Sequence, residues 1–247
     1  MNQLPILKKI KSDRLMLDQE LSSKTLKISP YKKNSFQKIE EELKQTPVLN
    51  QKLYLHSLQR QLSLIKLEEI LIIISLITAG VLGRILLQPL PSVEPITFFA
   101  ILAGSLFGWK KGAFAGATSW YLSNFFMFGG QGPWTVVHFA NGAIAGFLGG
   151  IFLQKPGYTK TIIVMIITTI IFEITINLMS GLFFYGILAS FITAIPFTIT
   201  HIVSNILFSS FIPVSRKEIC EKGKLNEKEL CEKFIKKLKS LKGKNES

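Results

Sequence analysis

The sequence predicts an all-α, polytopic membrane protein with six transmembrane helices and both termini in the cytoplasm. The first observation is composition: apolar residue types make up 48% of the 247 residues, charged types make up 18%, and the mean hydropathy is +0.34. The second is the position of the charges. Residues 1–69 hold 13 Lys/Arg and 8 Asp/Glu, and residues 215–247 hold 11 and 6. The third is the middle of the chain, which is almost uncharged and contains apolar runs long enough to cross a bilayer.

Four of the six helices follow from run length. Residues 70–90 and 134–154 each supply about the 20 residues that one crossing needs. The stretch 161–211 contains no Lys or Arg and a single acid, Glu173, and is too long for one crossing. It therefore predicts two helices, hinged within 180–186, where Ser-Gly and Tyr-Gly pairs interrupt the apolar pattern.

The region 95–128 has two readings. Its apolar runs, 96–109 and 113–128, are separated by Lys110 and Lys111. A re-entrant hairpin would put both ammonium groups near mid-membrane, at a cost of about 2.5–3.5 kcal/mol each. Two short helices with the lysines in water avoid that cost, so six helices are expected.

The positive-inside rule fixes the orientation. Both tails, the Lys110/Lys111 pair and the loop that holds Lys155 and Lys160 fall on one side, whereas loops near 88–95, 128–133 and 181–187 contain no Lys or Arg. Both termini are therefore expected in the cytoplasm, and the cell membrane is the expected location.

We predict three parts of the chain. Residues 1–69 form a cytoplasmic extension whose segment 48–69 is an amphipathic helix; residues 70–213 form the membrane domain; and residues 214–247 form a basic tail. In the tail, Asn226 and Glu229 have the spacing of a capping box. Contact of these helices with membrane lipid is favoured over docking to a cytoplasmic partner.

Several functions are disfavoured. Basic tails beside membrane spans explain the pI of 9.7 better than nucleic-acid binding does. The sequence lacks an HExxH motif, a G-x-S-x-G elbow and a P-loop, so no enzyme, metal or cofactor is predicted. Cys220 and Cys231 have no nearby His and are expected to be ordinary reduced thiols.

Polar side chains gather toward the predicted outer half of the membrane domain. Because such groups are expensive in lipid, they are candidates for substrate binding. Arg84 has two readings, ligand contact or pairing with Glu94 or Glu173. His201 and Asn205 lie on one stripe with Thr198 and are expected to bond neighbouring helices. The candidate binding residues are Arg84, Glu94, Trp120, Asn124, Gln131, Trp134, His138, Asn141, Glu173 and Asn177.

Small residues allow helices to approach closely in lipid. Gly112 and Gly116 in the third helix, and the glycine row at 142, 146 and 150 in the fourth, are expected to pack within the protein. On the first helix, Ser75, Ala79 and Gly83 form a stripe that could pack internally or receive a partner subunit.

Two segments resemble substrate-specific (S) components of energy-coupling factor (ECF) transporters. One is the run Pro-Leu-Pro-Ser-Val-Glu-Pro-Ile-Thr at 89–97, and the other is Ser-Asn-Phe-Phe at 123–126 followed by Gly-Gln-Gly-Pro-Trp-Thr at 130–135. The resemblance covers about 70–213. It implies a six-helix binder of a vitamin or similar micronutrient that works with a transmembrane T component and two cytoplasmic ATPases. It also implies an outer gate at 91–95, a pocket around 124–141, and a T-component contact at Ser75, Ala79 and Gly83.

The leading hypothesis is therefore a membrane-embedded substrate-capture subunit. The alternative is a stand-alone, proton-coupled secondary transporter of a small polar solute, in which Glu173 and either His138 or His201 carry the proton. A structural or assembly protein without a ligand is the third class considered.

Overall fold

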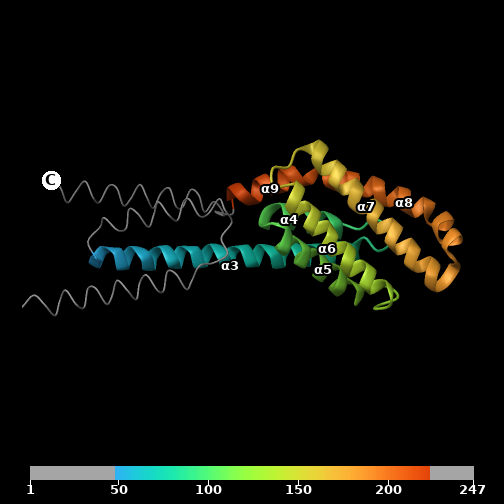
Figure 1. Ribbon diagram of the computed structural model, residues 1–247, viewed down its shortest axis with the longest axis horizontal. Coiled ribbons are helices and arrows are strands. Elements are labelled where there is room, and N and C mark those ends of the chain that lie inside the picture. The colour runs from blue at the N-terminus through green and yellow to red at the C-terminus, as the bar shows by residue number, and fades with distance from the viewer. Residues whose placement is uncertain (1–47, 223–247) are drawn as a thin grey trace, which may run out of the picture. The chain divides into compact units, whose positions relative to one another are not determined.

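The computed structural model describes residues 48–222, and in this range the chain is helical with short connections and no strand (Figure 1). Of the described residues, 60–222 belong to one compact unit, and residues 48–59 are the first part of the helix α3 (Val48–Leu86). The predicted all-α class is confirmed for the described residues. The elements are α3 (Val48–Leu86), α4 (Ile96–Phe107), α5 (Trp109–Asn124), α6 (Trp134–Phe152), α7 (Tyr158–Ser180), the π-helical turn η1 (Gly181–Tyr185), α8 (Ile187–Ser209) and α9 (Phe211–Lys222).

Four helical stretches are long and apolar enough to cross a membrane: Ser63–Leu86, Trp134–Phe152, Tyr158–Phe184 and Ile187–Cys220. The length and apolar composition of these helices are those of a membrane protein. The helices α4 and α5 have 12 and 16 residues, or about 18 and 24 Å, which is shorter than the hydrocarbon core. Whether these two also cross remains a prediction.

Helices α4, α5 and α6 pack together through glycines (Figure 1). A Cβ added at Gly116 would lie 2.0 Å from the carbonyl oxygen of Gly142, and one at Gly146 would lie 2.0 Å from that of Gly112. Backbone therefore touches backbone along α5 and α6. The expected internal role of this glycine row is confirmed.

Helices α7 and α8 form a hairpin with its reversal at η1 (Figure 1). The turn ends at Gly186, whose φ of 79° is costly for any residue with a Cβ. A Cβ at Gly181 would lie 2.6 Å from Cα of Ile187, so the reversal also needs a small residue there. The predicted hinge within 180–186 is confirmed.

Helix α3 continues without a break from Val48 through the first predicted span. The predicted segment 48–69 is thus helical. One face of α3 contributes Ile73, Leu76 and Ile77 to the core, while Ile74 and other apolar side chains on the opposite face are exposed, as lipid contact requires.

Helix α9 closes the described part of the chain. Its Ile212 is fully buried in the core, and Arg216 Nε donates to the carbonyl oxygen of Ser105 at 3.1 Å. The predicted boundary at 213 falls inside this helix. Residues 1–47 and the predicted capping box at Asn226 and Glu229, together with Cys231, lie outside the described residues.

Candidate functional site: a buried polar cluster

Arg84, on the last turn of α3, is the centre of the polar cluster. Only 5% of the residue is exposed. Its Nη1 donates to Ser123 Oγ at 2.8 Å and to Asn124 Oδ1 at 2.6 Å, and its guanidinium carbon lies 4.3 Å from the ring centre of Trp120. Its Nε is 3.6 Å from Oε1 of Glu94. Of the two carboxylates that the sequence offered as partners, Arg84 pairs with Glu94.

Asn124, at the end of α5, connects Arg84 to α6. Its Oδ1 is 3.2 Å from Nδ1 of His138, and its Nδ2 is 3.5 Å from Oγ1 of Thr135. The ring of His138 also lies 4.5 Å from that of Trp120. Asn124 is 1% exposed, so these contacts are made away from solvent and are strong constraints on side-chain position.

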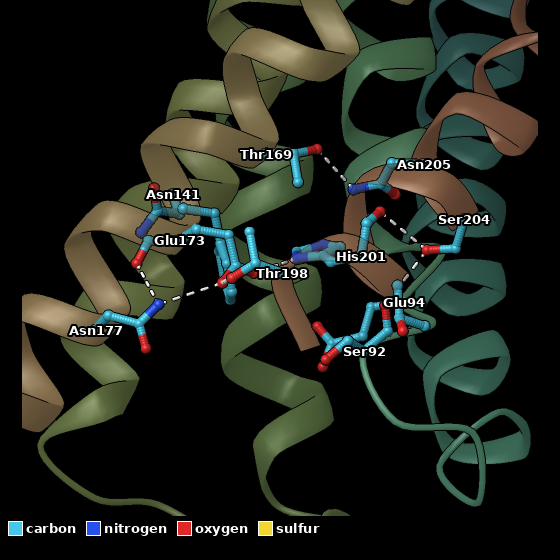
Figure 2. Close-up of polar contacts among 12 residues, drawn as sticks. Ser92, Glu94, Asn141, Thr169, Glu173, Asn177, Thr198, His201, Ser204 and Asn205 are labelled. Atoms are coloured by element: carbon cyan, nitrogen blue, oxygen red, sulfur yellow. Dashed lines mark hydrogen bonds and ion pairs between the residues drawn. The ribbon is translucent and has the colours of Figure 1, made fainter. Parts of the chain in front are cut away.

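Glu173, on α7, forms a second group of contacts with α8 (Figure 2). His201 Nδ1 lies 2.6 Å from its Oε1, and Thr198 Oγ1 donates to its Oε2 at 2.7 Å. Asn177, one turn along α7, reaches the same Oε2 at 3.3 Å. The carboxylate is therefore held by three side chains, and the expectation that His201 bonds a neighbouring helix is confirmed.

Aromatic rings connect the two groups. The Phe172 ring is 5.1 Å from that of Trp120, 5.7 Å from that of His138 and 5.2 Å from that of His201. The residues around Arg84 and those around Glu173 are thus neighbours across one buried aromatic layer. Phe172 was missed by sequence reasoning because a phenylalanine in an apolar run carries no polar signal.

The remaining predicted site residues lie at the edges. Asn141 donates to Thr175 Oγ1 at 2.7 Å and joins α6 to α7. Gln131 is exposed and donates to the carbonyl oxygen of Tyr121 at 3.0 Å, while Trp134 Nε1 donates to that of Gly130 at 3.1 Å. Gln131 and Trp134 therefore shape the loop 125–133, and none of their hydrogen bonds reaches Arg84 or Glu173 directly.

A groove of about 270 Å³ lies between α7 and α8, beside Glu173. Glu173, Asn177 and Thr198 form its polar wall. The other lining residues are apolar: Ile170, Ile174, Phe191, Ile195 and Ile199. Thr198 entered the sequence analysis only as part of a polar stripe, and its contact with Glu173 depends on how α8 packs against α7.

The arrangement is suited to binding through hydrogen bonds. It contains a paired cation and anion, amide and imidazole groups and an aromatic layer, all at low exposure. Within residues 48–222, no group of three or more His, Cys, Asp or Glu side chains could hold a metal ion.

Together, the apolar helices and this buried cluster define a helical membrane protein with a polar site inside its helix bundle. Residues 65–216 match a family of unknown function, DUF6580, and the chain belongs to that family. Searches of the curated proteins and of the solved structures each found no match.

We expect Glu173→Ala to destabilise the protein by about 1–3 kcal/mol, because it leaves the donors on Thr198, Asn177 and His201 without their acceptor. Glu173→Gln retains one oxygen and should cost less. The measurement is the thermal unfolding midpoint in detergent, with Glu69→Ala as control. Glu69 pairs with the exposed Lys111, and such surface pairs contribute little. Equal midpoints for Glu173→Ala and the control would contradict this prediction.

Proposed function

We propose that this protein is the substrate-binding S component of an ECF-type transporter in the cell membrane. In this proposal it has six transmembrane helices and cytoplasmic termini. It captures a vitamin or similar micronutrient from outside, and a T component with two ATPases drives uptake. The observation that carries the proposal is the buried polar cluster, which α3, α5, α6 and the loop 87–95 build around Arg84 inside a nearly uncharged membrane domain.

The position of the cluster supports capture from outside. Arg84 is near the end of α3, Asn124 is the last residue of α5, and His138 is in the first turns of α6. These ends meet next to the loops 87–95 and 125–133, which contain no Lys or Arg. By the positive-inside rule, loops of this kind face outward.

The exposed side of α3 supports a partner contact. Ser75 is exposed and Ala79 is half-buried, so both are available to a neighbouring subunit. Gly83 differs, because a Cβ there would lie 2.7 Å from Cγ of Pro95. Gly83 therefore packs against the chain's own loop, and a bulky residue at this position would disturb the site as well as any interface.

We expect a tagged chain, purified gently from its native membrane, to co-purify with a T component and two ATPases. We also expect native mass spectrometry of the purified protein to detect a bound, vitamin-sized ligand. Ser75→Phe should abolish recovery of the partners and leave the ligand bound, because Ser75 lies away from the cluster. Ile74→Phe, at an exposed neighbouring position, is the matched control. Recovery of neither partners nor ligand with the unmodified chain would contradict the proposal.

A proton-coupled secondary transporter is the second candidate. The contact between Glu173 and His201 favours it, because a carboxylate and an imidazole 2.6 Å apart inside a membrane helix pair can exchange a proton. Purified protein in liposomes distinguishes the two: substrate accumulation driven by a pH gradient alone indicates the carrier, whereas tight binding without accumulation indicates the S component.

A further inference from the structure

The groove of about 270 Å³ between α7 and α8 has a carboxylate in its wall. The side chain of Glu173 is 13% exposed, so its carboxylate can be reached from the groove. The apolar lining residues Ile174, Ile195 and Ile199 are 51%, 55% and 58% exposed, and they lie on helices long enough to cross the membrane. Exposed apolar side chains on such helices face lipid, and an ionisable group inside a membrane is expensive and commonly functional. The groove is therefore a candidate ligand site that opens toward lipid.

The hydrogen-bond donors in the polar wall of the groove are already used within the protein (Figure 2). Asn177 Nδ2 donates to the carbonyl oxygen of Glu173 at 2.8 Å and to its Oε2 at 3.3 Å, so both amide hydrogens are used. The hydroxyl of Thr198 donates to the same Oε2 at 2.7 Å. The oxygens that remain for a ligand, on these three side chains, are acceptors. A complementary ligand must therefore be a donor.

The acceptor character of the wall does not depend on the protonation of His201. His201 Nδ1 contacts the other carboxylate oxygen, Oε1, at 2.6 Å, and His201 is not among the residues that line the groove. Thr198 and Asn177 donate to Oε2 whichever ring nitrogen of His201 holds a proton. The donors and acceptors that face a ligand are thus the same for either tautomer.

The charge of the wall favours a cation. The segment 161–211 contains no Lys or Arg, and the guanidinium of Arg84 pairs with Glu94 rather than with Glu173. Among the described residues, the only ion pair of Glu173 is with His201. A ligand ammonium would supply a counter-charge where water is scarce, and opposite charges attract strongly at low dielectric. An anionic ligand would instead face the carboxylate at short range.

Position and size narrow the class of cation. Glu173 lies about 16 Å along the helix from Phe184, the end of its membrane span, which places it near the middle of the bilayer. The charged headgroup of a phospholipid lies at the interface and does not match this depth. The groove volume is close to the lower end of the range of about 300–1,000 Å³ that is common for small-molecule sites. The matching ligand is therefore a small amine whose apolar body dissolves in lipid.

We propose that the groove binds a small primary alkylammonium that enters from the lipid bilayer. Its N–H groups donate to the oxygens of the polar wall, the Glu173 carboxylate balances its charge, and its apolar body lies along the isoleucines of α7 and α8. Arg84 and Glu94 do not line the groove, so this is a second site beside the buried cluster. The site does not depend on the proposed function.

The test is a titration of the full-length protein in lipid nanodiscs at neutral pH, followed by saturation-transfer NMR, with empty nanodiscs to subtract partition into lipid. The probe is 3-phenylpropylammonium. Its comparison compounds are 3-phenylpropanol, which is an uncharged donor, trimethyl(3-phenylpropyl)ammonium, which is a cation without an N–H group, and the anion 4-phenylbutanoate. We expect the probe to bind at least about tenfold more tightly than each of the other three. A smaller difference from any of them, or no binding of the probe, overturns the proposal.

Two variants assign the binding to the groove. Ile195→Trp fills the groove and leaves the carboxylate in place, so affinity for the probe should fall at least about tenfold. Glu173→Gln keeps the size of the side chain and removes its charge, and it should weaken binding by a similar factor. Ile192→Trp is the matched control, because Ile192 is 57% exposed, lies one turn away on α8 and does not line the groove. Unchanged affinity in folded Ile195→Trp or Glu173→Gln protein, or an equal loss in Ile192→Trp, overturns the assignment.

Discussion

Gly116→Val is expected to prevent stable folding of the membrane domain. A Cβ at this position would lie 2.0 Å from the carbonyl oxygen of Gly142 and 2.8 Å from the Cβ of Ala100, so it would contact both α6 and α4. Backbone atoms cannot move aside as a flexible side chain can. Overpacking ordinarily lowers the free energy of unfolding by about 1–3 kcal/mol. Here two helices would have to separate along their length, so we expect a loss of about 3 kcal/mol or more.

The measurement is the yield of monodisperse protein in detergent and its unfolding midpoint. Gly116→Ala should already lower the midpoint clearly. Gly157→Ala is the matched control, because a Cβ at Gly157 meets no atom within 4 Å and its φ of −113° suits any residue. A Gly116→Val protein as stable as the control would show that α5 and α6 are not in backbone contact.

Arg84→Met is expected to destabilise the protein by about 3–5 kcal/mol and to abolish ligand binding. The substitution removes the donor to Ser123 and Asn124 and leaves the carboxylate of Glu94 without its cation. Removing one member of a buried ion pair leaves an uncompensated charge, which is the source of the large cost. Arg84→Lys keeps the charge but cannot reproduce the planar fork that bonds two acceptors, so it should recover only part of the stability.

The test combines thermal unfolding with the native mass measurement of bound ligand. The double variant with Glu94→Gln should be more stable than Arg84→Met alone, because it removes the unpaired charge, and it should still lack ligand. Arg60→Met, on the exposed surface of α3, is the control. Normal stability and normal ligand content in Arg84→Met would contradict the central place of Arg84 in the site.

Much of the membrane domain could be read from the sequence because its signals are local. Run length predicted the long helices, and the small and turn-forming residues at 180–186 predicted the reversal that η1 makes. Spacing of glycines along α5 and α6 predicted their close approach, since positions four apart share one helix face. Orientation and the number of crossings depend on the membrane itself and remain predictions.

The pairing of polar groups was only partly predictable. Sequence placed Arg84, Glu94 and Glu173 at similar depth, but either carboxylate was an acceptable partner for the guanidinium. The tertiary structure determined which carboxylate pairs with Arg84. The loop 87–95 places Glu94 beside Arg84. The packing of α8 on α7 instead places Glu173 in contact with His201 and Thr198.

The sequence by itself therefore determined that this is a membrane protein and where its long apolar helices lie, because hydropathy and charge are properties of individual residues. Which polar atoms are paired, and which on Arg84, Glu94 and His201 are left unpaired within the described residues, was decided only by the fold. Side-chain hydrogen bonds require positions set to a fraction of an ångström, and those positions arise from contacts between segments that are far apart along the chain.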